Sequence, residues 1–199
     1  MGLIMTKDVR KIKTERDIQQ ALLKLLESKT FRQITVADIC QLSLTSRSTF
    51  YAHYLDKYDL LDKMVDGFTK LFASRVNLRF NQIVQGEINE LVHGLLKDME
   101  DNRRAIIILF TVHEPNADLE ANFKSLLLQE WKKFIKESGS NMDVPVDLMA
   151  SMGMNLQMTV IEWALSHGES EIDAVTAAIN AIRDAIMVQI QPINKKSDL

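Results

Sequence analysis

The sequence predicts an all-α protein, and three observations support this fold class. The three prolines (Pro115, Pro145 and Pro192) lie late in the chain, so none interrupts a helix before residue 115. No segment alternates apolar and polar residues over the length of a strand. Apolar residues instead recur at helical spacing, and 46% of the 199 residues are hydrophobic. That is enough to build a sizeable helical core.

Four helices are expected in the first third of the chain. A T-x-x-D start signal at Thr14 opens the first, which covers residues 14–28. A second start signal precedes a short helix over residues 35–42, and a tight turn leads into another short helix over residues 46–54. A much longer helix begins at Asp56.

The rest of the chain is predicted to form a helical bundle. Three or four helices fit residues 81–190, and the last two, residues 146–167 and 171–190, are rich in small residues. Small side chains let helices approach closely, and apolar residues occupy more than one face of both helices. One face can pack inside the chain and another against a second subunit. We therefore expect a homodimer built on the last two helices, with a monomeric bundle as the alternative.

The two short helices at residues 35–54 form the pattern of a helix-turn-helix, whose second helix fits the major groove of DNA. In the exposed first turn of that helix, Arg47 is able to make a bidentate contact to guanine. Hydroxyl, imidazole, ammonium and backbone N–H donors nearby suit phosphate oxygens. The expected DNA-binding residues are Thr35, Ser46, Arg47, Ser48, Thr49, Tyr51, His53 and Lys57.

The charge distribution agrees with a DNA-binding head. Residues 1–58 carry 10 Lys and Arg against 6 Asp and Glu, a net charge of +4, whereas residues 59–199 carry 14 against 21, a net charge of −7. We expect a first domain, residues 1–58, with an N-terminal arm and the helix-turn-helix, and a second, residues 59–199, for effector binding and dimerisation. The basic arm is expected to reach phosphates through Lys7, Arg10, Lys11 and Lys13.

Residues 14–65 resemble the DNA-binding domain of the TetR family of bacterial transcriptional regulators. The resemblance is carried by Thr49, Phe50, Tyr51, His53, Tyr54, Asp56, Lys57, Leu60 and Leu61. It implies a fold of about nine helices, a homodimer and a small-molecule pocket in the C-terminal domain. It also implies that Arg47 and Ser48 read bases and that Thr49, Tyr51, His53 and Lys57 contact the DNA backbone.

The turn of the helix-turn-helix departs from the family pattern. The family usually has Ala-Gly followed by Val or Ile, whereas this chain has Ser43, Leu44 and Thr45. The glycine is favoured because the residue that ends the first helix adopts a left-handed conformation. We therefore expect Leu44 to be strained by about 1 kcal/mol. Thr45 replaces a hydrophobic residue that anchors the turn.

An effector pocket is harder to place in the sequence than the DNA-binding residues. Large, adaptable side chains and two polar ones in the C-terminal domain are candidates to line it, although such residues also fill cores. The candidates are Met99, Phe110, His113, Trp131, Met152, Asn155, Met158 and Trp163.

Several classes of protein are not expected. One cysteine cannot form an internal disulfide, and the longest apolar run (residues 105–110) is far too short for a membrane span, so a cytoplasmic location is expected. No catalytic, cofactor-binding or metal-binding motif is complete, so no enzyme is expected. The predicted function is a homodimeric regulator, most simply a ligand-responsive repressor, on a pseudo-palindromic operator. The alternative is a co-regulator or activator that acts through a partner protein and binds DNA weakly on its own.

Overall fold

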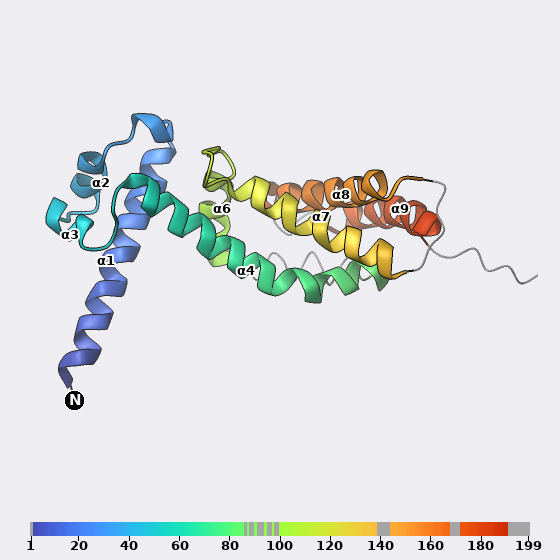
Figure 1. Ribbon diagram of the computed structural model, residues 1–199, viewed down its shortest axis with the longest axis horizontal. Helices are drawn as coiled ribbons and strands as arrows, with labels where there is room; N and C mark the ends of the chain where they lie inside the picture. Colours follow the sequence, from blue (N-terminus) through green and yellow to red (C-terminus); the bar gives the residue numbers. More distant parts are fainter. Residues whose placement is uncertain are drawn as a thin grey trace, which may run out of the picture. The chain divides into compact units, whose positions relative to one another are not determined.

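In the computed structural model, the part of the chain that is described consists of helices joined by turns and loops (Figure 1). The structure describes residues 2–85, 87, 90, 94, 97, 100–138, 144–167 and 172–190. None of these residues belongs to a β-strand, so the predicted all-α fold class is confirmed. Within the same ranges, no helix combines the length and the hydropathy that a bilayer crossing requires.

Contacts divide the chain into two compact units. The first unit consists of Met1–Thr69 and Arg104–Leu119, and the second of Lys70–Arg103 and Glu120–Leu199. The helices in chain order are α1 (Gly2–Leu26), η1 (Phe31–Gln33), α2 (Val36–Leu42), α3 (Arg47–Tyr51), α4 (Lys57–Gln85), η2 (Glu100–Asn102), α6 (Arg103–Leu109), α7 (Leu119–Glu137), α8 (Val146–His167) and α9 (Ile172–Ile190).

The helix α1 begins much earlier than the sequence predicts. It starts at Gly2 rather than at Thr14, so the expected N-terminal arm is the first half of a continuous helix. No proline or glycine lies between residues 3 and 13, and extending an existing helix costs far less than starting one. The T-x-x-D pattern at Thr14 therefore lies inside the helix instead of capping it.

The starts of α2, α3 and α4 follow the prediction closely, whereas α3 ends at Tyr51, three residues before the predicted end at residue 54. Thr35 and Ser46 are the N-caps of α2 and α3, and α4 begins directly after Asp56. The core that holds them together is made of fully buried side chains from each of these segments. Its members include Ile18, Leu22, Ile34, Ile39, Phe50, Leu60 and Leu61. Val36, the first residue of α2, is only half-buried.

The second unit is organised around Trp131 of α7, whose side chain is 1% exposed. Its ring makes edge-on contacts with Phe80 and Phe134, at centroid distances of 5.1 and 6.1 Å. Its indole N–H donates to the side chain of the buried residue Gln157 on α8. The helix α8 approaches closely because Gly153 presents no side chain to the indole ring. The bounds of α8 and α9 agree with the predicted residues 146–167 and 171–190 to within one residue.

Candidate nucleic-acid interface

The helix α2 begins with a reciprocal cap. The Thr35 hydroxyl accepts the backbone N–H of Asp38 at 3.2 Å, and the Asp38 carboxylate accepts the backbone N–H of Thr35 at 2.8 Å. The same carboxylate accepts the Thr35 hydroxyl at 2.7 Å. These hydrogen bonds lower the pKa of Asp38 below its ordinary value. The hydrogen bond from the Thr35 hydroxyl has the larger effect, and that from the Thr35 backbone N–H has the smaller one. Thr35 is exposed.

The turn between α2 and α3 is strained at Leu44, as predicted. Leu44 has φ = 54°, the positive φ of a left-handed residue, and its side chain is 94% exposed. Polar contacts anchor the turn in place of the family's hydrophobic residue. The Ser43 hydroxyl lies 2.8 Å from the Thr45 hydroxyl and donates to the carbonyl of Ile39 at 2.8 Å. The Thr45 N–H donates to the carbonyl of Cys40 at 3.0 Å.

The first turn of α3 presents polar side chains to solvent. Ser46 caps the helix by accepting the backbone N–H of Thr49 at 3.0 Å, and its hydroxyl lies 2.8 Å from those of Ser48 and Thr49. Ser46, Arg47 and Ser48 are all exposed, and Thr49 is half-buried. Behind them Phe50 is fully buried and fixes the rotation of the helix. The start of α3 is therefore a rigid, polar surface with a guanidinium group.

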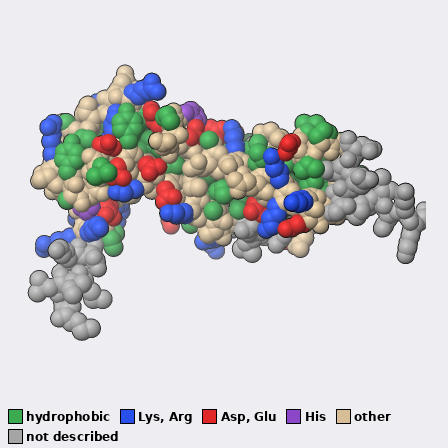
Figure 2. Space-filling view, in the orientation of Figure 1, with side chains coloured by type: hydrophobic (Ala, Val, Ile, Leu, Met, Phe, Trp, Pro, Cys, Tyr) green, Lys and Arg blue, Asp and Glu red, His purple; other side chains and the backbone are tan. Residues whose placement is uncertain are grey.

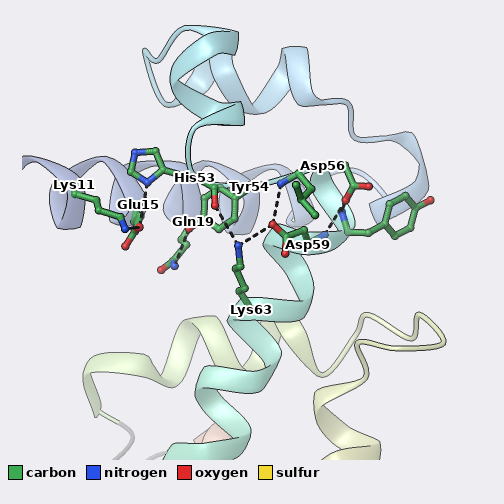
Figure 3. A network of polar contacts seen from close by, with 10 residues as sticks. Lys11, Glu15, Gln19, His53, Tyr54, Asp56, Asp59 and Lys63 are labelled. Carbon is green, nitrogen blue, oxygen red and sulfur yellow. Dashed lines mark hydrogen bonds and ion pairs between the residues drawn. The ribbon is translucent and has the colours of Figure 1, made fainter.

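The end of α3 is tied to α1 through His53. The His53 side chain is only 10% exposed, and its Nδ1 lies 3.1 Å from the Glu15 carboxylate (Figure 3). Tyr54 accepts a hydrogen bond from the Gln19 amide at 3.3 Å. Burial raises the pKa of the Tyr54 phenol, and the Gln19 hydrogen bond opposes this shift. Tyr51, by contrast, is exposed. Sequence reasoning did not find Glu15, because it lies 38 residues from His53 and carries no motif.

Lys57, predicted to contact phosphate, is committed to the protein backbone. Its ammonium donates to the carbonyls of Phe31, Arg32 and Ile34 at 2.9, 3.1 and 2.7 Å. It also lies 4.8 Å from the centre of the Phe31 ring. An ammonium has three N–H donors, so each is used. A phosphate contact would require Lys57 to leave at least one of these carbonyls.

A second ammonium fastens the loop between α3 and α4. Lys63 donates to the His53 carbonyl at 3.2 Å and to the Asp59 carboxylate at 2.9 Å, and Asp59 accepts the Leu55 N–H at 2.9 Å (Figure 3). The hydrogen bond from Lys63 and then that from Leu55 lower the pKa of Asp59, and Asp59 in turn raises the pKa of Lys63. The beginning of α4 thus binds both flanks of the helix-turn-helix: Lys57 binds the segment before α2, and Lys63 binds the segment after α3.

The basic residues expected in a flexible arm lie on α1. Arg10, Lys11 and Lys13 are exposed on this helix, and Lys11 lies 3.9 Å from Glu15. Lys7 lies within the helix, and its side chain is outside the described part of the structure. Because these residues lie on one α-helix, the spacing of their basic side chains is fixed.

The effector candidates belong to both units and differ in exposure. Met99 lies outside the described residues, and Phe110 and His113 belong to the first unit, where His113 lies 2.9 Å from Asp118. In the second unit, Met152 and Asn155 are exposed, whereas Trp131 and Met158 are buried in the core. Trp163 is half-buried and stacks on His167 at a centroid distance of 5.0 Å. The sequence alone did not show which of these candidates are buried and which are exposed. No group of described histidine, cysteine or acidic residues could hold a metal ion.

The fold and this exposed polar surface define a class: an all-helical protein that carries a helix-turn-helix near its N-terminus. Two solved structures share the fold over nearly their whole length. A TetR-family regulator from Streptococcus agalactiae is 24% identical, with a TM-score of 0.59, and covers 90% of this chain and 98% of its own. A TetR-family regulator from Syntrophomonas wolfei is 18% identical, with a TM-score of 0.61, and covers 91% and 98%. The fold is therefore that of the TetR family, as the resemblance implied.

A sequence relative agrees with this result. The chain is 28% identical over 126 residues to the dhaKLM operon transcriptional activator DhaS of Lactococcus lactis. The match covers 63% of this chain and spans 60% of the length of that relative. No model of a protein family matches the chain. The matched proteins are transcriptional regulators rather than enzymes, in agreement with the sequence analysis.

Proposed function

We propose that the protein is a DNA-binding transcriptional regulator whose base contacts come from the first turn of α3. One observation carries this proposal: Ser46, Arg47 and Ser48 are exposed together on a helix that Phe50 and the Ser46 cap hold rigidly. Residues at this position of a helix-turn-helix meet base edges in the major groove. Arg47 supplies the bidentate donor pair that guanine accepts, and the exposed Tyr51 supplies a hydroxyl donor for a phosphate oxygen.

We further propose a homodimer that binds a pseudo-palindromic operator. Apolar side chains of α8 and α9 are left exposed in the single chain and support a contact with a second copy. They are Val146, Leu148, Met152, Ile182 and Val188. In such a dimer the two copies of α3 lie about 34–36 Å apart, or a multiple of this distance, to meet successive major grooves.

The proposed regulator responds to a small-molecule effector, and it either represses or activates transcription. A small molecule bound by residues 59–199 would change DNA affinity only by its preference for one dimer geometry over another. The resemblance implies repression relieved by a ligand, whereas the L. lactis relative is named an activator. Transcription from an operator-bearing promoter in a purified system, with and without the protein, decides the sign.

The variants Arg47→Ala and Arg47→Lys test the role of α3. Arg47→Ala should lower affinity for the operator by about 10- to 100-fold while affinity for random DNA falls much less. Arg47→Lys keeps the charge but loses the bidentate geometry, so it should retain the affinity for random DNA and lose the base preference. The measurement is a titration of operator and random duplexes at several salt concentrations.

The matched control is Lys133→Ala, which removes an exposed charge from α7 in the second unit and should leave both affinities unchanged. If the Arg47 variants bind both duplexes like the parent, α3 is not the reading helix. If the parent itself shows no salt-dependent binding to DNA from its own locus, the protein acts through a partner protein, which is the alternative predicted from the sequence.

A further inference from the structure

The first unit contains a groove that the proposed function does not use. It lies between the beginning of α4 and the loop that follows α6, and its volume is about 540 Å³. Two apolar side chains form part of its wall without being covered: Leu55 is 81% exposed, and Tyr58 is half exposed. Tyr58 is held in place by an edge-on contact with Phe31 at 5.2 Å. The groove is therefore preformed and partly apolar.

Carboxylates surround this apolar wall. Asp56, Asp59, Asp62 and Glu114 all line the groove. Asp59 is paired with Lys63 at 2.9 Å and Glu114 with Arg32 at 3.4 Å, whereas no basic residue within the described part of the chain is paired with Asp56 or Asp62. Figure 2 shows acidic side chains gathered over the beginning of α4. The groove therefore suits a ligand that is both cationic and apolar.

The exposed half of α1 has the complementary character. Val9 and Ile12 are each 65% exposed and lie three residues apart on one helix face. Lys13 and Arg16 lie four and seven residues from Val9 and share this face, and both are exposed. This face, made of Val9, Ile12, Lys13 and Arg16, is called the α1 face below. It combines two apolar and two cationic side chains.

We propose that the α1 face of one copy docks in the groove of a second copy. Lys13 and Arg16 then meet Asp56 and Asp62, and Val9 and Ile12 cover Leu55 and Tyr58. The contact joins two different surfaces, so it is head-to-tail and repeats from copy to copy unless the geometry closes a ring. It is separate from the proposed two-fold contact of α8 and α9. The exposed charges make it weaken as salt concentration rises.

The same basic helix is a candidate for contact with DNA phosphates. Docking in the groove and lying along a phosphate backbone exclude one another, because both use the cations of α1. The acidic groove therefore competes with DNA for this helix. Free protein would associate head-to-tail, and an excess of operator duplex would separate the copies.

Cross-linking between two differently labelled copies tests the contact. One copy carries Ile12→Cys and the other Leu55→Cys, and they are mixed with a short bismaleimide at low salt. Both substituted side chains are exposed, so neither change disturbs the core. The matched control replaces the second copy with Leu44→Cys, which is equally exposed but lies outside the groove. The parent protein, whose buried Cys40 is its only cysteine, gives the background.

The expected result is a cross-linked pair with Leu55→Cys at several times the yield obtained with Leu44→Cys, falling as salt is added. Adding Asp62→Lys to the groove copy should lower the yield about fivefold, whereas Glu137→Lys on α7 should not change it. Equal yields with Leu55→Cys and Leu44→Cys, or no effect of Asp62→Lys, would overturn the proposal. This readout needs no DNA, so it stands or falls independently of the proposed function.

Discussion

At the scale of single residues, two features of the helix-turn-helix stand out: the backbone conformation of Leu44 and the contacts of the Lys57 ammonium. Leu44 adopts a left-handed backbone that favours glycine, and this was predicted from its place in the turn, where the family usually has glycine. The role of Lys57 was not predictable, because its partners are three backbone carbonyls, which leave no trace in the sequence. A motif can place a lysine in a family position, but it does not say which acceptors surround its ammonium.

Replacing Leu44 with glycine should stabilise the protein. Glycine relieves the left-handed strain, and the lost side chain is 94% exposed, so little burial is given up. The expected gain is about 1 kcal/mol in the free energy of unfolding, measured by urea denaturation. Leu44→Ala removes the same exposed side chain but keeps the strain, and it should change stability by less than about 0.5 kcal/mol. An equal gain for both variants would show that the backbone is not strained.

Replacing Lys57 with methionine should destabilise the first unit. Methionine keeps the apolar contact with the Phe31 ring but leaves three carbonyls without their charged donor. A loss of about 2 kcal/mol is expected, the range of hydrogen bonds to charged groups. Lys29→Met, which removes only an exposed ion pair with Asp38 at 3.3 Å, should cost less than about 1 kcal/mol. If both variants lose the same free energy of unfolding in urea titrations, the three hydrogen bonds of Lys57 stabilise the protein no more than an exposed ion pair does.

At the scale of secondary structure, helix ends were predictable where a cap or a breaker marks them. The caps Thr35 and Ser46 place α2 and α3, and the bounds of α8 and α9 follow from apolar periodicity. The start of α1 was missed because nothing in residues 3–13 stops a helix once it has formed. The pairing of α7 with α8 through Gly153 was also missed, because close packing depends on which residue faces the glycine.

Adding one methyl group to α8 should show how closely it packs. A Cβ at Gly153 would lie 2.6 and 2.7 Å from two atoms of the Trp131 indole, so the ring would have to move. Gly153→Ala should therefore destabilise by about 1–3 kcal/mol. The control is Gly67→Ala on α4, where nothing lies within 4 Å of the new Cβ, and where alanine should stabilise by about 0.5–1 kcal/mol. The same sign for both variants in thermal denaturation would contradict this packing.

At the scale of the whole molecule, the fold class and the order of helices were predictable, whereas the polar network of the first unit was not. Periodicity and proline placement predict an all-α chain, and the motif around Thr49–Tyr54 predicts the fold that the chain shares with the two solved TetR-family structures. Contacts such as that of Glu15 with His53 arise only when distant segments meet. The effector site stays a prediction, because ligand-binding and core side chains have the same composition.

The stability of the first unit should fall in acid. The pKa of Glu27 is lowered by hydrogen bonds from Lys24 and Arg104, and those of Asp38 and Asp59 are lowered as described above. A carboxyl group whose pKa is lowered by folding stabilises the folded state fully when the pH is above the pKa that the group has in the unfolded chain. That pKa is 4.5 for Glu27 and 3.8 for the two aspartates. This stabilisation is lost as pH falls through the lower, folded pKa values.

Urea midpoints measured from about pH 5 down to about pH 2.5 should therefore decrease steadily. In the double variant Glu27→Gln, Asp38→Asn the decrease should be shallower, because two of the titrating groups are gone. A slope unchanged by the double variant would assign the acid sensitivity to other carboxylates.

The placement of the aromatic residues makes the two units optically distinct. The two tryptophans, Trp131 and Trp163, belong to the second unit, and the three tyrosines, Tyr51, Tyr54 and Tyr58, belong to the first. Fluorescence excited at the red edge of indole absorption therefore reports on the second unit alone, while tyrosine emission comes from the first unit. One unlabelled sample is enough to follow whether the two halves of this protein melt together or in turn.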